Sequence, residues 1–156
     1  MDKFDDKNIN EQMDTLIARI YEKFAQYSIK EIKGVCTGCC VSKSSIEEII
    51  TVPLRELSWH AVYEYLDAAK YDVEFLIPEA KYLLPRIIEL YISSEYVRQP
   101  PEFTFQTCHF EKAAYWCKEE TDLIREFAEL HFKRQLLKKI HIFNQTNLFL
   151  CGMKQD

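Results

Sequence analysis

The sequence predicts an all-α protein, a compact bundle of about five to seven helices with at most a minor strand. The chain of 156 residues contains only three glycines and five prolines, whereas an all-β fold needs many turn residues. Several long stretches also carry apolar residues at intervals of three and four. We expect a single helical domain over residues 1–156, in which residues 1–8 and 143–156 pack loosely.

The first expected helix covers residues 9–27, where apolar side chains recur on one face. A connection follows over residues 28–43, and it holds two of the three glycines and three of the six cysteines. Ser44 or Ser45 is expected to cap a short helix that ends near Ile50, because a serine hydroxyl accepts a hydrogen bond from a first-turn amide.

Ser58 is expected to cap the next helix, over residues 59–70. Residues 75–97 form an apolar helical stretch that contains Pro78 and Pro85. Since proline fits best in a first turn, we expect a short helix from Pro78 and a longer, central helix from Pro85. The most buried aliphatic residues are expected in this stretch: Leu83, Leu84, Ile87, Ile88 and Leu90.

An extended loop is expected over residues 98–108, where Phe103 and Phe105 alternate with polar residues and predict a short strand or a packed arm. The last helical region is expected over residues 110–142, with a break near Glu120. Its predicted buried side consists of Trp116, Leu123, Ile124, Phe127, Leu130, Phe132, Leu136, Leu137 and Ile140.

The charge distribution narrows the classes of partner. Residues 56–122 carry six Lys or Arg against thirteen Asp or Glu, so this acidic middle disfavours nucleic acid as a partner. The basic residues Lys133, Arg134, Lys138 and Lys139 are interpreted as the solvated end of a helix. No apolar run reaches 18 residues, so no membrane-spanning helix and no membrane partner are expected. The N-terminus is acidic and does not resemble a signal peptide, which predicts a cytoplasmic protein.

Reactive side chains are concentrated in the turn Cys36-Thr37-Gly38-Cys39-Cys40. Its Cys-x-x-Cys spacing lets two thiolates bind one zinc ion, or lets a dithiol undergo redox chemistry. The ligand set is incomplete, so the sequence does not decide whether this turn binds a metal ion. The favoured interpretation is that the three cysteines are structural thiols, with at least one packed in the core against the first helix. Further ligands would have to come from Cys108, His109 or Cys117.

Other chemical motifs are weak. Arg55 and Arg86 fit either an anion clamp or structural ion pairs, and the structural alternative is favoured because arginine suits buried pairs. The sequence has no Gly-rich phosphate loop, metalloprotease helix, hydrolase elbow or calcium loop. We therefore expect no catalytic residues, no enzyme activity and no cofactor.

Three segments together resemble a family of bacterial helical proteins with no established activity. They are the turn at Cys36, Cys39 and Cys40, the segment Pro53-Leu54-Arg55-Glu56-Leu57-Ser58, and the segment from Tyr82 to Leu90, which reads Leu-Leu-Pro-Arg-Ile-Ile-Glu-Leu after Tyr82. The resemblance covers roughly residues 12–95. It implies a helical fold and a bacterial origin, and it supplies no mechanism.

The leading hypothesis for function is a non-enzymatic protein-binding protein, such as an immunity protein or adaptor that binds a protein partner, for example a cognate toxin. Complementary charge speeds association and sets specificity, so an acidic surface is expected to bind a basic protein partner. It comprises Glu64, Asp67, Asp72, Glu74 and Glu79. The alternative is a metal- or redox-responsive protein centred on the turn from Cys36 to Cys40. The sequence leaves the oligomeric state open.

Overall fold

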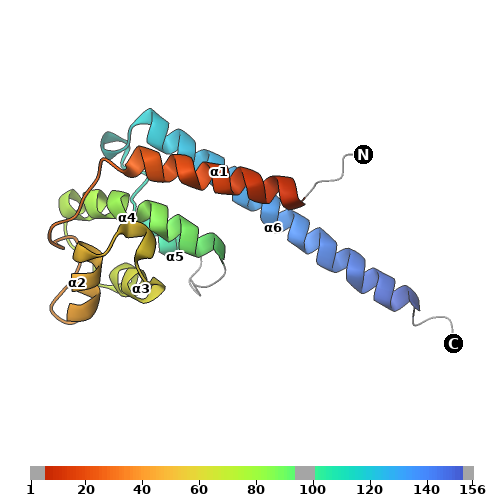
Figure 1. Ribbon diagram of the computed structural model, residues 1–156, viewed down its shortest axis with the longest axis horizontal. Coiled ribbons are helices and arrows are strands. Elements are labelled where there is room, and N and C mark those ends of the chain that lie inside the picture. The colour runs from red at the N-terminus through yellow and green to blue at the C-terminus, as the bar shows by residue number, and fades with distance from the viewer. Residues whose placement is uncertain (1–5, 94–100, 153–156) are drawn as a thin grey trace. The chain divides into compact units, whose positions relative to one another are not determined.

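The predicted helical class is confirmed. The computed structural model describes residues 6–93 and 101–152, with side chains for 7–93 and 104–140, and these residues form helices without a strand (Figure 1). An isolated antiparallel bridge joins Val35 to Lys70. The elements are α1 (Asp6–Phe24), α2 (Lys43–Thr51), the 3-10 helix η1 (Leu54–Glu56), α3 (Trp59–Asp67), α4 (Val73–Ser93), α5 (Pro101–Gln106), the 3-10 helix η2 (Ala113–Tyr115) and α6 (Lys118–Gly152).

The chain divides into two compact units, residues 1–16 with 122–156, and residues 17–121. Helices α1 and α6 each begin in one unit and end in the other. The expectation of one domain over 1–156 stays a prediction. Its loosely packed ends, residues 1–8 and 143–156, fall almost entirely outside the described side chains.

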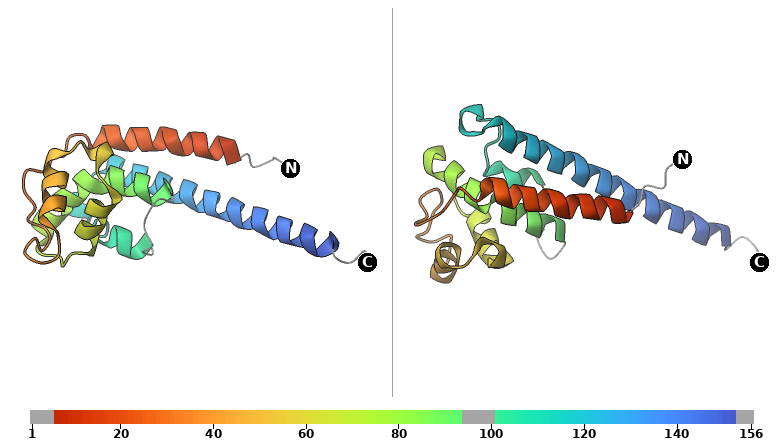
Figure 2. Two further views of the ribbon diagram at one scale, coloured as in Figure 1. Left: turned by 60° about the horizontal axis from the view of Figure 1, so that its bottom comes forward. Right: turned by 45° about the horizontal axis from the view of Figure 1, so that its top comes forward.

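The first unit combines the start of α1 with most of α6, which run antiparallel (Figure 2). Both helices bury one face at intervals of three and four residues. The break predicted near Glu120 lies slightly earlier, since η2 ends at Tyr115 and α6 is continuous from Lys118 to Gly152. Between these ends the sequence has no glycine or proline, and good helix formers dominate. The buried residues are Ile9, Met13 and Leu16 in α1, and Leu123, Phe127 and Leu130 in α6.

Helix α4 is the centre of the second unit. Eleven of its 21 residues are buried, so nearly every side of the helix meets protein. The five predicted core residues are confirmed, since Leu83, Leu84, Ile87, Ile88 and Leu90 are at most 3% exposed. One core cluster combines residues of α2, α3 and α4, among them Ile49, Tyr65 and Leu76.

The prediction that Pro78 and Pro85 each begin a helix is wrong. Both lie inside α4, where a proline removes one backbone hydrogen bond and costs about 3 kcal/mol. Burial of the surrounding apolar residues offsets this cost, because a fully buried aliphatic side chain contributes about 1.5–3 kcal/mol. Packing therefore overrides the local preference of proline for a helix start.

Serine caps begin two helices of the second unit. Ser58 precedes α3 as predicted, and its hydroxyl accepts a hydrogen bond from Ala61 N at 3.2 Å. Helix α2 begins earlier than predicted, since Ser42 and not Ser44 or Ser45 is its cap, accepting from Ser45 N at 3.2 Å. Each cap satisfies a first-turn amide that the helix itself leaves without a partner.

The extended loop with a short strand, expected near Phe103 and Phe105, is wrong because residues 101–106 form α5, although Phe105 does pack against the core cluster. Pro101 begins this helix, at the position where proline costs least. Cys117, which directly precedes α6, is exposed. On the last helix, Phe132, Leu136 and Ile140 are exposed and do not belong to its buried side.

A buried ion pair joins α4 to the first turn of α6 within the second unit. Lys81 of α4 donates to the carboxylate of Glu120 at 2.8 Å, and both side chains are less than one-tenth exposed. The ammonium also lies over the rings of Tyr27 and Trp116, 5.0 and 4.7 Å from their centres. Burial works against ionisation of Glu120, but hydrogen bonds from Lys81, Tyr27 and Cys117 N outweigh it and lower its pKa.

No helix within the described residues combines the length and the apolar character that crossing a lipid bilayer requires.

Candidate metal centre

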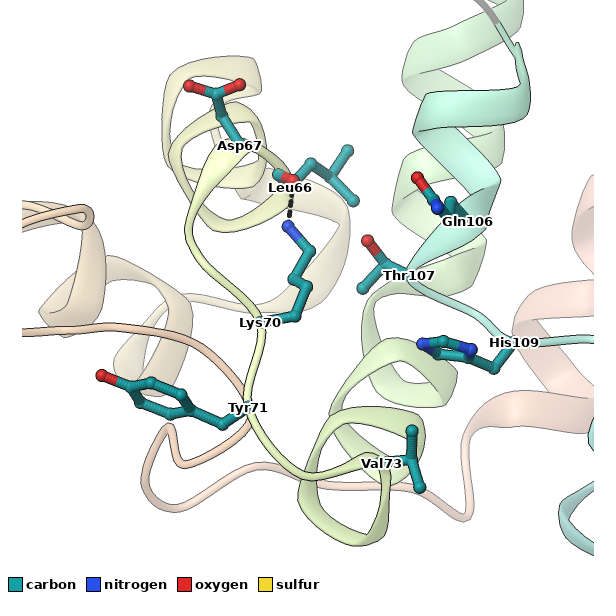
Figure 3. A pocket seen from close by; sticks show the side chains of 8 residues that line it. All are labelled: Leu66, Asp67, Lys70, Tyr71, Val73, Gln106, Thr107 and His109. Carbon is teal, nitrogen blue, oxygen red and sulfur yellow. Dashed lines mark hydrogen bonds between the residues drawn. The ribbon is translucent and has the colours of Figure 1, made fainter.

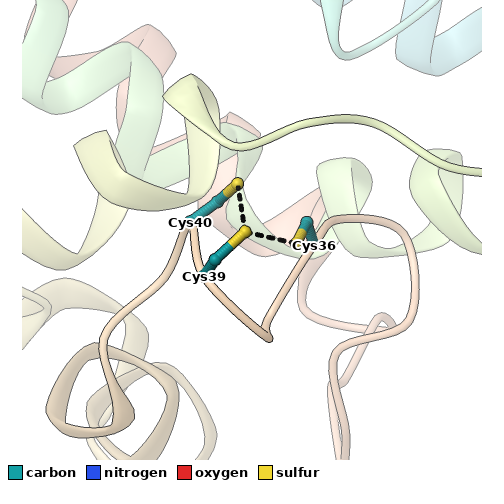
Figure 4. Close-up of side chains that lie close together, drawn as sticks. All are labelled: Cys36, Cys39 and Cys40. Atoms are coloured by element: carbon teal, nitrogen blue, oxygen red, sulfur yellow. Dashed lines mark hydrogen bonds between the residues drawn. The ribbon is translucent and has the colours of Figure 1, made fainter.

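The three cysteines of the 36–40 turn converge on one point (Figure 4). The Sγ atoms of Cys36 and Cys39 are 3.5 Å apart, and those of Cys39 and Cys40 are 3.6 Å apart. All three sulfurs lie within 4.8 Å of one another. Among the described residues, no fourth His, Cys, Asp or Glu joins this group. The thiol cluster, defined as Cys36, Cys39 and Cys40, thus offers three soft ligand atoms.

A short backbone pairing positions the beginning of the turn. Cys36 N donates to Ala69 O, and Tyr71 N donates to Gly34 O, each at 2.8 Å. These two bonds frame the isolated bridge between Val35 and Lys70. Since Val35 is buried, the backbone on the N-terminal side of Cys36 is fixed against the connection between α3 and α4.

Gly34 allows the same segment to approach α4 closely. A Cβ at this position would lie 2.6 Å from Leu76 Cα and 2.7 Å from Glu79 Oε2. The carboxylate of Glu79 accepts hydrogen bonds from the backbone amides of Lys33 and Gly34, and from the Tyr65 hydroxyl at 2.8 Å. Burial, reinforced by this carboxylate, raises the pKa of Tyr65 well above its usual value. Glu79 is therefore an internal anchor of the chain that leads to Cys36.

The C-terminal side of the turn is fixed by α2 and α3. Cys40 packs against the core cluster of α2, α3 and α4, and Val41 is buried within it. Glu64 of α3 accepts hydrogen bonds from Ser42 N at 2.9 Å and from Ser42 Oγ at 2.8 Å. These hydrogen bonds lower the pKa of Glu64 to about 2. The expectation that a thiol of the turn faces the core holds for Cys40, although the cluster it meets contains no residue of α1.

Hydrogen bonds make the three thiols unequal. The Tyr71 hydroxyl and the backbone amide of Cys39 stabilise the thiolate of Cys36, which lowers its pKa to about 6. The neighbouring sulfurs of Cys36 and Cys40 have the opposite effect on Cys39 and raise its pKa to about 11. Of Cys36 and Cys39, Cys36 is therefore the thiol that ionises at the lower pH.

The structure separates the five acidic residues of the predicted partner surface. Asp67, Asp72 and Glu74 are exposed, and Asp72 accepts a hydrogen bond from Glu74 N at 3.0 Å. Glu64 is half-buried and holds the cap of α2, whereas Glu79 is 7% exposed and bonded internally. Glu79 thus cannot present its charge to a partner, and partner binding by the exposed three stays a prediction.

The other predicted ligands do not join the thiol cluster. Cys108 is fully buried, and burial raises its pKa to about 12, while Cys117 is exposed. His109 Nδ1 lies 2.8 Å from Glu111 Oε1. The ligand set on the described residues is therefore limited to three sulfurs.

Arg55 and Arg86 are used structurally, as the sequence favoured. Arg86 donates to Leu57 O through two nitrogens, at 2.9 and 2.8 Å, and to Glu89 at 2.7 Å. The guanidinium of Arg55 lies 3.7 Å from the centre of the Tyr21 ring and 3.6 Å from Glu89. Both guanidinium groups thereby contact Glu89 within this unit.

A pocket of about 630 Å³ lies between the α3–α4 connection and the segment after α5 (Figure 3). Lys70 reaches into it, but its ammonium already donates to Leu66 O and to Ala68 O, the latter at 2.6 Å. His109 has a positive φ of 48° at the opposite wall. Since Lys70 is satisfied by carbonyls, we assign the pocket no ligand. Its lining residues are Leu66, Asp67, Lys70, Tyr71, Val73, Gln106, Thr107 and His109.

Comparison of the chain with protein-family models, with curated proteins and with solved structures gives no match.

Proposed function

We propose that the protein binds one thiophilic metal ion through Cys36, Cys39 and Cys40. The observation that supports this is the convergence of three sulfurs within 4.8 Å. Zinc–sulfur bonds of about 2.3 Å in a tetrahedral arrangement hold two sulfurs about 3.8 Å apart. The observed separations of 3.5 and 3.6 Å need only a small rearrangement to reach this value.

The chemistry of the cluster favours a soft cation. Thiolates select Cu⁺ and Zn²⁺ over the hard cations Mg²⁺ and Ca²⁺, which prefer oxygen ligands. A redox dithiol would need only two cysteines, whereas here a third sulfur, that of Cys40, completes the group. Metal binding therefore explains the arrangement better than dithiol chemistry alone.

The test is metal binding by purified protein kept under reducing conditions. Elemental analysis and competitive titration with Zn²⁺ and Cu⁺ should show one ion per chain. Cys39→Ser should abolish this binding while leaving helical content unchanged, because Cys39 is exposed. Cys117→Ser is the matched control, since Cys117 is also an exposed cysteine but lies outside the cluster. Binding that survives Cys39→Ser, or that is absent from the unaltered protein, would refute the proposal.

A second candidate function is the binding of a basic protein partner, such as a toxin, at Asp67, Asp72 and Glu74. The specific observation is that these exposed carboxylates are accompanied by two exposed aromatic residues, Tyr71 and Phe75. Aromatic residues are enriched at protein interfaces, and charge complementarity steers association. The supporting result would be a basic protein that copurifies with the unaltered chain and with Cys39→Ser, but not with the double variant Asp67→Lys with Glu74→Lys. Retention by the charge-reversed protein would count against it.

A further inference from the structure

Helix α6 carries an exposed apolar stripe on residues 131–140. Phe132, Leu136 and Ile140 are 63%, 43% and 55% exposed. Residues four apart lie on one side of a helix, so the three side chains form a continuous stripe about two turns long. Exposed apolar residues in such a row mark an interaction surface more often than scattered ones do.

The same ten residues are strongly basic. They contain Lys133, Arg134, Lys138 and Lys139, and no Asp or Glu occurs from residue 130 to residue 155. Lys133, Lys138 and Lys139 are exposed. The sequence interpretation of these residues as a favourable helix end is wrong, because α6 continues to Gly152. The helix dipole acts only within the last turn and so does not account for these charges.

We propose that residues 131–140 of α6 bind an anionic lipid surface, with the helix lying in the plane of the membrane interface. A helix with an apolar stripe and a lysine-rich remainder matches this environment on both sides, since the stripe enters the acyl boundary while the lysines meet anionic headgroups. This arrangement requires no membrane-spanning segment.

Charge argues against the other occupants of this stripe. Two copies of the chain packed along it would bring lysine-rich segments together, and like charges at an interface oppose association. Nucleic acid would satisfy the lysines, but its phosphate backbone offers no apolar surface for Phe132, Leu136 and Ile140. An anionic bilayer satisfies both features at once.

The test is sedimentation of the full chain with vesicles of phosphatidylcholine, alone or mixed with phosphatidylserine. We expect binding only when phosphatidylserine is present, and weaker binding as salt rises. Neutralising three exposed lysines, Lys133→Gln with Lys138→Gln and Lys139→Gln, should weaken binding at least tenfold. The control neutralises three exposed lysines elsewhere, Lys30→Gln with Lys43→Gln and Lys112→Gln, and should change binding less than threefold.

The apolar stripe is tested separately with Phe132→Ser, which should weaken vesicle binding, against Phe75→Ser, an exposed aromatic residue outside the stripe, which should not. Both variants keep buried residues intact, and circular dichroism checks their helical content. Four results would overturn the proposal: no binding to phosphatidylserine vesicles, equal binding to phosphatidylcholine alone, equal loss in both triple variants, or dimerisation that Phe132→Ser abolishes. Binding of duplex DNA without binding of vesicles would also overturn it.

Discussion

Replacing Gly34 by alanine should destabilise the second unit, whereas replacing Gly38 should not. The added Cβ of Gly34→Ala would lie 2.6 Å from Leu76 Cα, and ordinary contact begins near 3.4 Å. The neighbouring atoms at the closest contact belong to the backbone of α4, so they cannot rotate away as a side chain would. The segment around residue 34 must therefore move by roughly 0.8 Å, as overpacked sites generally do.

This displacement strains two hydrogen bonds of Gly34. Gly34 N donates to the carboxylate of Glu79 at 2.9 Å, and Gly34 O accepts from Tyr71 N at 2.8 Å. A hydrogen bond to a charged group contributes about 1.5–3 kcal/mol and a neutral one about 0.5–1.5 kcal/mol. We therefore expect Gly34→Ala to lower the free energy of unfolding by about 2–4 kcal/mol.

Gly38→Ala, in the turn that follows Gly34, is the matched control. No heavy atom lies within 4 Å of its added Cβ, and neither glycine has a positive φ. Because alanine restricts the unfolded chain more than glycine does, we expect stabilisation of up to about 1 kcal/mol. Urea unfolding followed by tryptophan fluorescence measures both changes, since Trp59 and Trp116 lie in the second unit. Equal losses in the two variants, or a loss below about 0.5 kcal/mol for Gly34→Ala, would refute the reasoning.

Two further predictions concern buried and capping charges. Lys81→Met should cost about 3–5 kcal/mol in urea unfolding, because it leaves the buried carboxylate of Glu120 without its cation, and adding Glu120→Leu should recover part of this loss. The pKa of Glu64 falls from 4.5 to about 2 on folding, so its stabilisation is complete above pH 4.5 and is lost as pH falls toward 2. Thermal melts should therefore show that Glu64→Gln loses less stability over this pH range than the unaltered protein does. An equal loss in both proteins would contradict the role of Glu64 in capping α2.

Local signals predicted the helices well. Ser58 was identifiable as a cap because the interaction of its hydroxyl with Ala61 N spans only three residues. The helix start at Pro85 was predicted wrongly because the interactions that compensate for a proline inside α4 are not local. Leu84 and Ile88 on either side are fully buried, and their burial depends on elements far away in sequence. A preference of about 3 kcal/mol is reversed once several such side chains are buried.

The acidic surface shows the limit of charge counting. Asp67 and Glu79 contribute equally to the net charge of the middle segment, yet one is exposed and the other bonded to Gly34 N, 45 residues away in sequence. Their neighbours in the sequence do not distinguish them. Asp67 lies between Leu66 and Ala68, and Glu79 lies between Pro78 and Ala80, so both acidic residues have apolar neighbours. Only the fold buries Glu79 and supplies the donors that a buried carboxylate needs.

The thiol cluster depends both on the local spacing of its cysteines and on contacts with residues distant in sequence. Spacing alone brings Cys36 near Cys39, but adjacent residues such as Cys39 and Cys40 point apart in an extended chain, so their sulfurs meet at 3.6 Å only in a tight turn. That turn is held by the pairing of Cys36 N with Ala69 O on one side and by Ser42 with Glu64 on the other. Both partners belong to a later part of the sequence, which is why spacing could not show that the three sulfurs converge. A metal ion bound there would consequently stabilise the contacts among α2, α3 and α4 that assemble its site, because an ion that binds only the folded state shifts the folding equilibrium by its own binding free energy.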